Sequence, residues 1–410
     1  MIPREPSDNS LAFLREGYTF VSSRCDRLGT DLFETRIMMT PVVCMRGAGA
    51  AEVFYGGDRF TRTGALPKSV LHLLQDEGSV QALDGTAHHH RKRLFLDLLT
   101  PDAIGRMVLI FGQLWQEALP RWQARRRIVL HEELLPLLTR TAAIWAGAPL
   151  NDHELALRSR ELGAMVEHAG SLGPRNWWAR MLRNRCERWA QDAIGRMRTD
   201  GIRPDVPAAQ ALAAHTESDG QPLPLSLAAI ELLNLLRPIV AIGRFIVFAA
   251  LALYRYPHWR AALASGDGDL EPFVQEVRRT SPFFPVVGGR TREAFEWQGE
   301  QFAESRWVLL DLYGTNHDAR HWHEPAAFRP ERFRDWPGDP YTFVPQGGGP
   351  YETGHRCPGE MTTIEIVKEA VRRLVRTMTY RVPAQDLTVS LSRMPTLPRS
   401  GFVMTDIRPS

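Results

Sequence analysis

Phe343-Val-Pro-Gln-Gly-Gly-Gly-Pro-Tyr-Glu-Thr-Gly-His-Arg-Cys357-Pro-Gly-Glu is followed directly by an amphipathic run, Met361–Arg376. This pattern predicts a glycine-rich loop that places Cys357 at the start of a helix. There, backbone N–H groups and the helix dipole favour a thiolate. A thiolate can bind iron or attack a carbonyl carbon, and the alternative is a buried, inert cysteine beside a turn.

Composition and charge narrow the class of protein. The 410 residues are 44% hydrophobic, which is enough to bury a large core. The formal net charge of +3 comes from dispersed arginines and not from a basic block, which argues against a nucleic-acid-binding protein. The polar residues 1–10 contain no signal core and no membrane-spanning run. We therefore expect a soluble, cytoplasmic protein without an integral membrane segment.

The cysteines give no sign of a disulfide framework. The four of them, Cys25, Cys44, Cys186 and Cys357, show no paired spacing, so a CxxC zinc site is not predicted either. A reducing compartment fits this pattern.

The first 60 residues predict a small sheet and short helices, and most of the following residues up to 200 predict helices. We expect a helix within residues 10–25, strands at Phe33–Ile37 and Pro41–Met45, and a helix at Gly47–Tyr55. Amphipathic segments separated by Pro or Gly predict four helices, at Ile110–Arg126, Leu134–Ala146, Asp152–Ala169 and Trp177–Arg198. Asp200–Pro224 is rich in Asp, Pro, Gly and Ser, which predicts a flexible loop.

Three consecutive histidines, His88-His89-His90, stand at the start of a basic helix that follows Asp84. On a helix they point about 100° apart and cannot converge on one metal ion. His88 and Lys92, spaced i and i+4, share one face and could contact a bound anion, although a solvated basic face is the other interpretation.

Leu225–Arg255 predicts an apolar helix of about thirty residues, with two irregularities. Pro238 cannot donate to the carbonyl of Asn234, so we expect the helix to kink and open there. Beside it, Arg237 lies in an apolar run, where an unpaired guanidinium is costly. Its partner is either an unseen carboxylate of the protein or the carboxylate of a ligand with an apolar tail.

Glu276 and Arg279 lie at i and i+3 on a helix that ends before Pro282. Arg332 could join the same carboxylate. Short strands within residues 289–299 and 305–313, and a helical turn at residues 313–318, are predicted between them.

Glu276-x-x-Arg279, Phe-Arg-Pro-Glu-Arg332-Phe and the loop ending in His355-Arg-Cys357-Pro-Gly-Glu, in this order, closely resemble the cytochromes P450. The resemblance covers the whole chain. It implies a fold that is mainly α with small β-sheets and has a long central helix over the haem. It also implies one domain, 1–410, with a β-rich part at about 1–60, a helical body at about 61–280 and a haem-thiolate region at about 281–410.

The resemblance also assigns the cofactor and its contacts. Haem b, iron protoporphyrin IX, would have Cys357 as its axial thiolate, a ligand type that favours O–O cleavage. Glu276, Arg279 and Arg332 would form a structural network. The haem propionates would contact His88, Lys92, His355, Arg290 and Arg62.

Two departures from the usual motifs resemble one subfamily, the bacterial fatty-acid peroxygenases, which use hydrogen peroxide directly. Ordinary P450 monooxygenases have an acidic or amide residue followed by Thr in the long helix, where this chain has Arg237-Pro238-Ile-Val-Ala-Ile. Pro350 stands seven residues before Cys357, where the usual motif has Phe. In that subfamily the arginine of the Arg-Pro pair anchors the fatty-acid carboxylate. The partners implied are a fatty acid and hydrogen peroxide, with no redox partner required.

The residues themselves support the same chemistry. Peroxide needs a general acid–base group to move a proton from one oxygen to the other, and a helix without Thr or Asp at the kink supplies none. A substrate carboxylate held by Arg237 could do so. The reaction would then be assisted by its own substrate.

Gln81 bears on which product forms. The resemblance places Gln81 at the distal-pocket position where hydroxylating members are similar to this chain and the alkene-forming member has His. A neutral amide cannot donate a proton as an imidazolium can, so we expect hydroxylation at Cα or Cβ rather than decarboxylation. A satisfied loop amide without a chemical role is the alternative. Gln75 stands where relatives carry an aromatic residue, which leaves the preferred chain length open.

The sequence is compatible with three other classes of function. A cysteine hydrolase with Cys357 as nucleophile has no Cys–His–Asn pattern to support it. A haem sensor or carrier would bind haem without turning over peroxide. A conventional P450 monooxygenase would need a redox partner.

Overall fold

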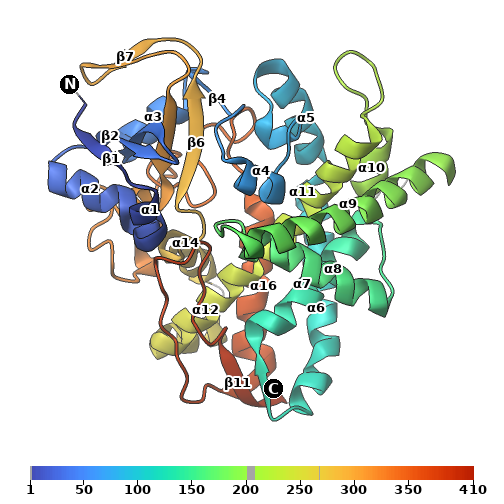
Figure 1. Cartoon of the computed structure of the whole chain (residues 1–410). Helices are drawn as coiled ribbons and strands as arrows, with labels where there is room; N and C mark the ends of the chain where they lie inside the picture. The colour runs from blue at the N-terminus through green and yellow to red at the C-terminus, as the bar shows by residue number, and fades with distance from the viewer. Residues whose placement is uncertain (1, 201–207, 267) are drawn as a thin grey trace.

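Most of the chain is helical, and its strands form one six-stranded sheet and two smaller sheets (Figure 1). The computed structural model describes residues 2–200, 208–266 and 268–410. The helices are α1 (Ser10–Glu16), α2 (Phe20–Leu28), α3 (Ala48–Tyr55), α4 (Lys68–Leu74), α5 (Gly85–Leu98), α6 (Pro101–Gln123), α7 (Leu130–Ala146), α8 (Asp152–Glu167), α9 (Pro174–Asp200), α10 (Ala208–Ala214), α11 (Leu225–Ala241), α12 (Gly243–Arg255), α13 (Pro257–Ser265), α14 (Leu270–Thr280), α15 (Leu312–Asn316) and α16 (Glu360–Arg372). The predicted fold class, mainly α with small sheets, is confirmed.

The six-stranded sheet joins two distant parts of the sequence. The strands are β1 (Arg4–Asp8), β2 (Leu32–Ile37), β3 (Thr40–Arg46), β4 (Phe60–Thr61), β5 (Arg127–Val129), β6 (Val286–Thr291), β7 (Phe295–Trp297), β8 (Glu300–Phe302), β9 (Trp307–Asp311), β10 (Met378–Arg381) and β11 (Val403–Pro409). The order in the large sheet is β1-β2-β3-β9-β6-β4, with β3 parallel to β9 and Cys44 opposite Leu309. The N-terminal part expected at about 1–60 therefore shares its sheet with residues from beyond 280.

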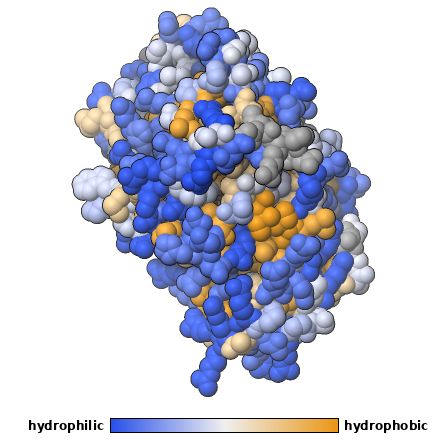
Figure 2. Space-filling model, turned by 90° about the vertical axis from the view of Figure 1, so that its right-hand side faces the viewer, coloured by the Kyte–Doolittle hydropathy of each residue, from blue (hydrophilic) through white to orange (hydrophobic). Residues whose placement is uncertain are grey.

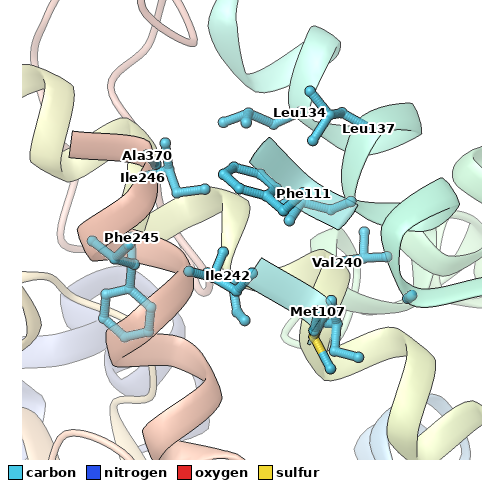
Figure 3. Packing of buried hydrophobic residues seen from close by; sticks show 14 of the residues in the cluster. Met107, Phe111, Leu134, Leu137, Val240, Ile242, Phe245, Ile246 and Ala370 are labelled. Carbon is cyan, nitrogen blue, oxygen red and sulfur yellow. The ribbon is translucent and has the colours of Figure 1, made fainter. Parts of the chain in front are cut away.

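The main core lies where α6, α7, α12 and α16 meet α11. Figure 3 shows the ring of Phe111 from α6 among side chains of these helices. Phe111 and Met107 are fully buried. Burying such a side chain is worth roughly 1.5–3 kcal/mol, so this contact holds the helices around the site in place.

The long apolar helix forms as predicted, but its break lies one turn later than expected. α11 continues through Pro238, and the interruption falls at Ile242, whose N–H is shared between the carbonyls of Pro238 and Ile239, both at 3.2 Å. Pro238 has no N–H to donate to the carbonyl of Asn234, yet α11 continues past it, and the interruption appears one turn later, before Gly243. The break in the helix that we expected at Asn234 therefore lies at Ile242.

Leu225–Arg255 is long and apolar enough to cross a membrane by length and composition, but 94% of its most apolar window is buried inside the protein. It is the central core helix of this fold. The face of the molecule in Figure 2 is largely hydrophilic, with hydrophobic residues gathered near its centre.

The prediction of a flexible loop at Asp200–Pro224 is partly wrong. Residues 201–207 lie outside the described residues, but Ala208–Ala214 form α10. The prediction rested on the average composition of the segment and overlooked its alanine-rich part, although alanine has the highest intrinsic helix propensity. Leu212 is fully buried in the main core. After α10, the N–H of Leu223 donates to the carbonyl of His215 (2.9 Å), which closes a short hairpin.

Candidate active site

The glycine-rich loop before Cys357 packs closely against Tyr55 at the end of α3. Gly349 has φ +80°, and a Cβ there would lie 2.8 Å from the Cβ of Tyr55. A Cβ on Gly348 would lie 2.7 Å from the carbonyl oxygen of Pro340. The loop closes where the N–H of Cys357 donates to the carbonyl of Gln346 (3.1 Å). Glycine is therefore required for the approach that fixes Cys357 just before α16.

Cys357 is the one cysteine of the four that is not fully buried. Burial nevertheless raises the pKa of its thiol; the N–H of Gly359 and the charges of Lys92 and Arg278 lower it, but by less. The N–H at the start of α16 thus acts in the predicted direction, although burial outweighs it in the net pKa. A metal ion deprotonates a coordinating thiol outright, so a bound iron would supply what the loop does not.

The donor set fits haem. Among the described residues there is no group of three or more His, Cys, Asp or Glu side chains placed to hold an ion, so Cys357 offers a lone sulfur, as suits an iron whose other ligands come from a porphyrin. Pro238 is exposed although every other residue from Ala228 to Leu253 is buried. Pro238 is thus the one exposed point between Ala228 and Leu253, next to Arg237.

α5 brings His88 and Lys92 to the segment just before Cys357. The rings of His88 and His355 stack with centroids 4.0 Å apart. The ammonium of Lys92 donates to the carbonyl oxygens of Gly354 and Arg356, the latter at 3.0 Å. Burial and neighbouring positive charges lower the pKa of His88 to about 3. Burial also lowers the pKa of His355 to about 4, although Asp84 opposes it. Both imidazoles are therefore neutral donors near pH 7.

Arg62 and Arg290, the two arginines predicted to contact the haem propionates, make different contacts. Arg62 donates to the carbonyl of Gly288 (2.6 Å), and its guanidinium lies over the ring of Phe54, 4.5 Å from the centroid. Arg290 donates to the carbonyls of Gly64 (2.8 Å) and Ser305 (3.1 Å). The described contacts do not bring Arg290 to the histidine pair.

Arg237 is buried on α11 without a carboxylate partner. Eight arginines are buried among the residues that the structure describes. Seven of them lie within 4.0 Å of a carboxylate, namely Arg24, Arg91, Arg158, Arg183, Arg244, Arg278 and Arg279. Arg237 has no such partner among the described residues. Its Nη2 donates to the carbonyl of Leu74 and to Oδ1 of Asn234 (3.0 Å), while its buried Nη1 has no partner.

The charge of Arg237 is destabilised by its surroundings. Burial and the charge of Arg183 lower the pKa of Arg237 to about 9, and Glu231 acts in the opposite direction. The group is still cationic at pH 7. The possibility of a structural ion pair, left open by the sequence, is not realised in the described part of the chain.

Gln81 is connected to Arg237 through Asn234. The Oε1 of Gln81 accepts hydrogen bonds from Nδ2 of Asn234 (3.1 Å) and from the hydroxyl of Ser79 (3.0 Å). Gln75 follows Leu74, whose carbonyl Arg237 contacts, and its own N–H donates to the carbonyl of Leu71 (2.8 Å). The segment that carries both glutamines is thus held to α11.

Sequence reasoning missed Glu231 and Asn234. Glu231 is fully buried and accepts from the N–H of Val80 (2.8 Å), from Arg91 (2.7 Å) and from Asn234 (2.9 Å). Glu231, Asn234 and Arg237 recur every three residues in an otherwise apolar helix. That spacing places them on one face and could have been noticed.

Glu276, Arg279 and Arg332 meet as the sequence predicted. Glu276 accepts two hydrogen bonds from Arg279, at 2.7 and 2.8 Å, and its Oε2 lies 3.3 Å from Nε of Arg332. Glu276 and Arg279 are fully buried. The network joins α14 to the 3₁₀ turn Pro330–Phe333.

Comparison with protein families and curated sequences finds similarity to the cytochromes P450. A family profile described as Cytochrome P450 matches residues 270–403. Cytochrome P450 71D18 of Mentha gracilis is 27% identical over 118 residues, which cover 28% of this chain and 23% of that protein. Cytochrome P450 4e5, mitochondrial, of Drosophila mettleri is 30% identical over 121 residues, covering 30% of this chain and 22% of that one. The matched segment thus spans about a quarter of the length of these curated relatives.

Solved structures match over the full length. Cytochrome P450SP alpha (CYP152B1) in complex with (R)-ibuprophen is 45% identical, covers 98% of this chain and 99% of that one, and has a TM-score of 0.95. Cytochrome P450EX alpha (CYP152N1) with myristic acid is 39% identical, covers 100% of both chains and has a TM-score of 0.97. A variant of cytochrome P450 OleT in complex with arachidonic acid is 32% identical, covers 100% and 99%, and has a TM-score of 0.97.

Proposed function

Because the chain belongs to the cytochrome P450 family, we propose that it is a haem-thiolate peroxygenase that uses hydrogen peroxide to hydroxylate long-chain fatty acids at Cα or Cβ. Haem b is its cofactor. Three similar solved structures hold carboxylic acids: ibuprofen, myristic acid and arachidonic acid. A carboxylic acid with an apolar tail is the substrate class that suits this site.

The observation that carries the proposal is the unpaired guanidinium of Arg237. A buried cation without a counter-ion is costly, and a fatty-acid carboxylate supplies the missing charge. One oxygen would take the free Nη1, and the fork geometry of arginine allows the other to share Nη2. The apolar residues of α11 around Arg237 suit the tail.

The residues near Arg237 leave the proton transfer to the substrate. Haem bound at Cys357 would supply the iron at which the O–O bond of peroxide breaks, and a thiolate ligand favours that cleavage. The run Arg237-Pro238-Ile-Val-Ala-Ile has no acid–base side chain, and Glu231 is occupied by Val80, Arg91 and Asn234. The carboxylate held by Arg237 takes a proton from one peroxide oxygen and returns it to the other. One C–H bond and one hydrogen peroxide become C–OH and water.

Gln81 favours hydroxylation over decarboxylation. Its oxygen accepts from Asn234 and Ser79, so its amide nitrogen is the end left to contact the substrate. An amide does not deliver a proton at neutral pH as a histidine can. Gln75, beside Leu74, would contribute to the choice of chain length.

The haem propionates are assigned to the cluster beside the Cys357 loop. His88, His355 and Lys92 lie together there, and Arg62 contacts the neighbouring strand β6. Arg290 is the least suited of these residues to contact a propionate, because its Nε and Nη1 already donate to backbone carbonyls. The protein works in the cytoplasm without a redox partner.

Product analysis tests the proposal. Purified enzyme is given hydrogen peroxide and palmitic or myristic acid without any reductase, and the products are identified by mass spectrometry. We expect 2- or 3-hydroxy acids. Arg237→Ala should abolish this turnover with normal haem content, whereas Arg255→Ala, on the exposed end of α12, should not. Unchanged turnover in Arg237→Ala would contradict the carboxylate anchor, and a terminal alkene as main product would contradict hydroxylation.

A further inference from the structure

The side-chain amide of Gln346 lies beside the sulfur of Cys357. Its Nε2 is 3.8 Å from Sγ and donates to the hydroxyl of Thr363 at 3.1 Å. On its other end, Oε1 accepts from Nε of Arg278 at 3.2 Å. Gln346 thus links α14, α16 and the cysteine loop.

The surroundings fix which end of the amide faces the sulfur. A guanidinium only donates hydrogen bonds, so the atom facing Arg278 must be the amide oxygen and the nitrogen must face Sγ. Arg278 cannot turn away, because it is 1% exposed and is held by Glu360 and by Gln275 (2.5 Å).

The hydrogens of the amide have two acceptors. The hydroxyl of Thr363 donates its own hydrogen to the carbonyl of Gly359 (3.2 Å), which leaves a lone pair for Gln346. One N–H of Gln346 therefore serves Thr363, and the other is available to Sγ. Thr363 is 3% exposed, so water has little access to either bond.

We propose that Gln346 is a positioning residue that tunes how much electron density the Cys357 thiolate donates to the haem iron. A hydrogen bond to a ligand sulfur stabilises negative charge on it and weakens its donation to the metal, and such bonds are among the levers that set redox potential. The backbone N–H of Gly359 hydrogen-bonds to the same sulfur. The inference rests on haem ligation by Cys357 and not on the fatty-acid substrate.

The test measures properties of the haem and not turnover. Gln346→Met has a similar length and no donor. We expect it to keep its haem, to shift the ferric/ferrous midpoint potential to a more negative value, and to lower the C–O stretching frequency of the ferrous CO adduct. Gln346→Glu also lacks the N–H donor but keeps an oxygen that can accept from Arg278. It therefore serves as a second variant in case Gln346→Met does not fold, and it should shift both values in the same direction.

Thr363→Val is the matched control, because it removes the other partner of the same amide and leaves the N–H that faces Sγ. It should shift the two values by clearly less. Unchanged values in both Gln346 variants, an equal shift in Thr363→Val, or loss of haem from both Gln346 variants would overturn the inference. A wild-type protein without a Soret band would instead contradict the haem assignment, so the two failures are distinguishable.

Discussion

Replacing Arg237 and replacing Arg279 should change the stability of the protein in opposite directions. Burial lowers the pKa of Arg237 to about 9, which corresponds to a cost of up to about 5 kcal/mol for keeping the charge inside. Arg237→Met removes that cost but also two hydrogen bonds, to Leu74 and Asn234, each worth about 1–1.5 kcal/mol. We therefore expect the fatty-acid-free holoenzyme to gain about 1–3 kcal/mol.

The pH dependence of this gain has a definite sign. The folded pKa of Arg237 lies below its unfolded value, so below about pH 9 the group is charged in both states and the full cost is present. The gain from Arg237→Met should be constant between pH 6 and 8, a window set by that pKa of about 9, and should shrink as the pH rises further.

Arg279→Met is the matched comparison. Arg279 is as deeply buried, but its removal leaves the fully buried carboxylate of Glu276 without its main partner. Breaking a buried pair in this way costs about 3–5 kcal/mol.

Thermal and urea unfolding of the two holoenzyme variants, followed by circular dichroism with and without palmitate, measures both effects. Palmitate should stabilise the wild type and not Arg237→Met. If Arg237→Met is destabilised as strongly as Arg279→Met, Arg237 has a structural partner and the reasoning from its unpaired charge is refuted.

Three more predictions follow from the site and the fold. Short external carboxylic acids should raise peroxide turnover of substrates that lack a carboxylate by at least about tenfold, measured by gas chromatography; no increase would contradict the acid–base role of the carboxylate. Gln81→His should move the product mixture from hydroxy acid toward terminal alkene, and an unchanged ratio in mass spectrometry would show that Gln81 has no chemical role. Burial raises the pKa of Asp311 to about 7, although the N–H of Gly314 opposes it, so the folded state binds this proton more tightly and loses stability as the pH rises from about 4 to 7. Asp311→Asn should therefore be more stable than the wild type at pH 8 by about 1–3 kcal/mol and equal to it near pH 4, and a difference in melting temperature that does not vary with pH would argue against this.

The parts of the site that the sequence predicted are those with a local signal. Cys357 stood out because glycines and a helix start surround it, and Arg237 because a charged residue beside proline interrupts an apolar helix. The contacts that were missed join distant segments: Asn234 donates to Gln81, 153 positions away, and Arg278 donates to Gln346, 68 positions away. No periodicity along the chain reports such contacts.

Two features depend on more than a local motif. The N–H of Gly359 favours the thiolate of Cys357, as its position before α16 predicts, but the burial that raises the pKa of the thiol comes from the packing around it. α10 was hidden because the average composition of residues 200–224 outweighed seven alanine-rich positions, Ala208–Ala214.

The parallel pairing of β3 with β9 affects how the chain folds during synthesis. β3 ends at Arg46 and β9 ends at Asp311, which are 265 residues apart. At roughly 5–20 residues per second, the ribosome needs roughly 13–50 seconds to cover that distance. For that interval β3 has only β2 as a partner, and its free edge is open to wrong pairing. Chaperone binding to the nascent N-terminal hairpin is therefore expected to end only once residue 311 has left the exit tunnel, shortly before the cysteine loop emerges to receive the haem.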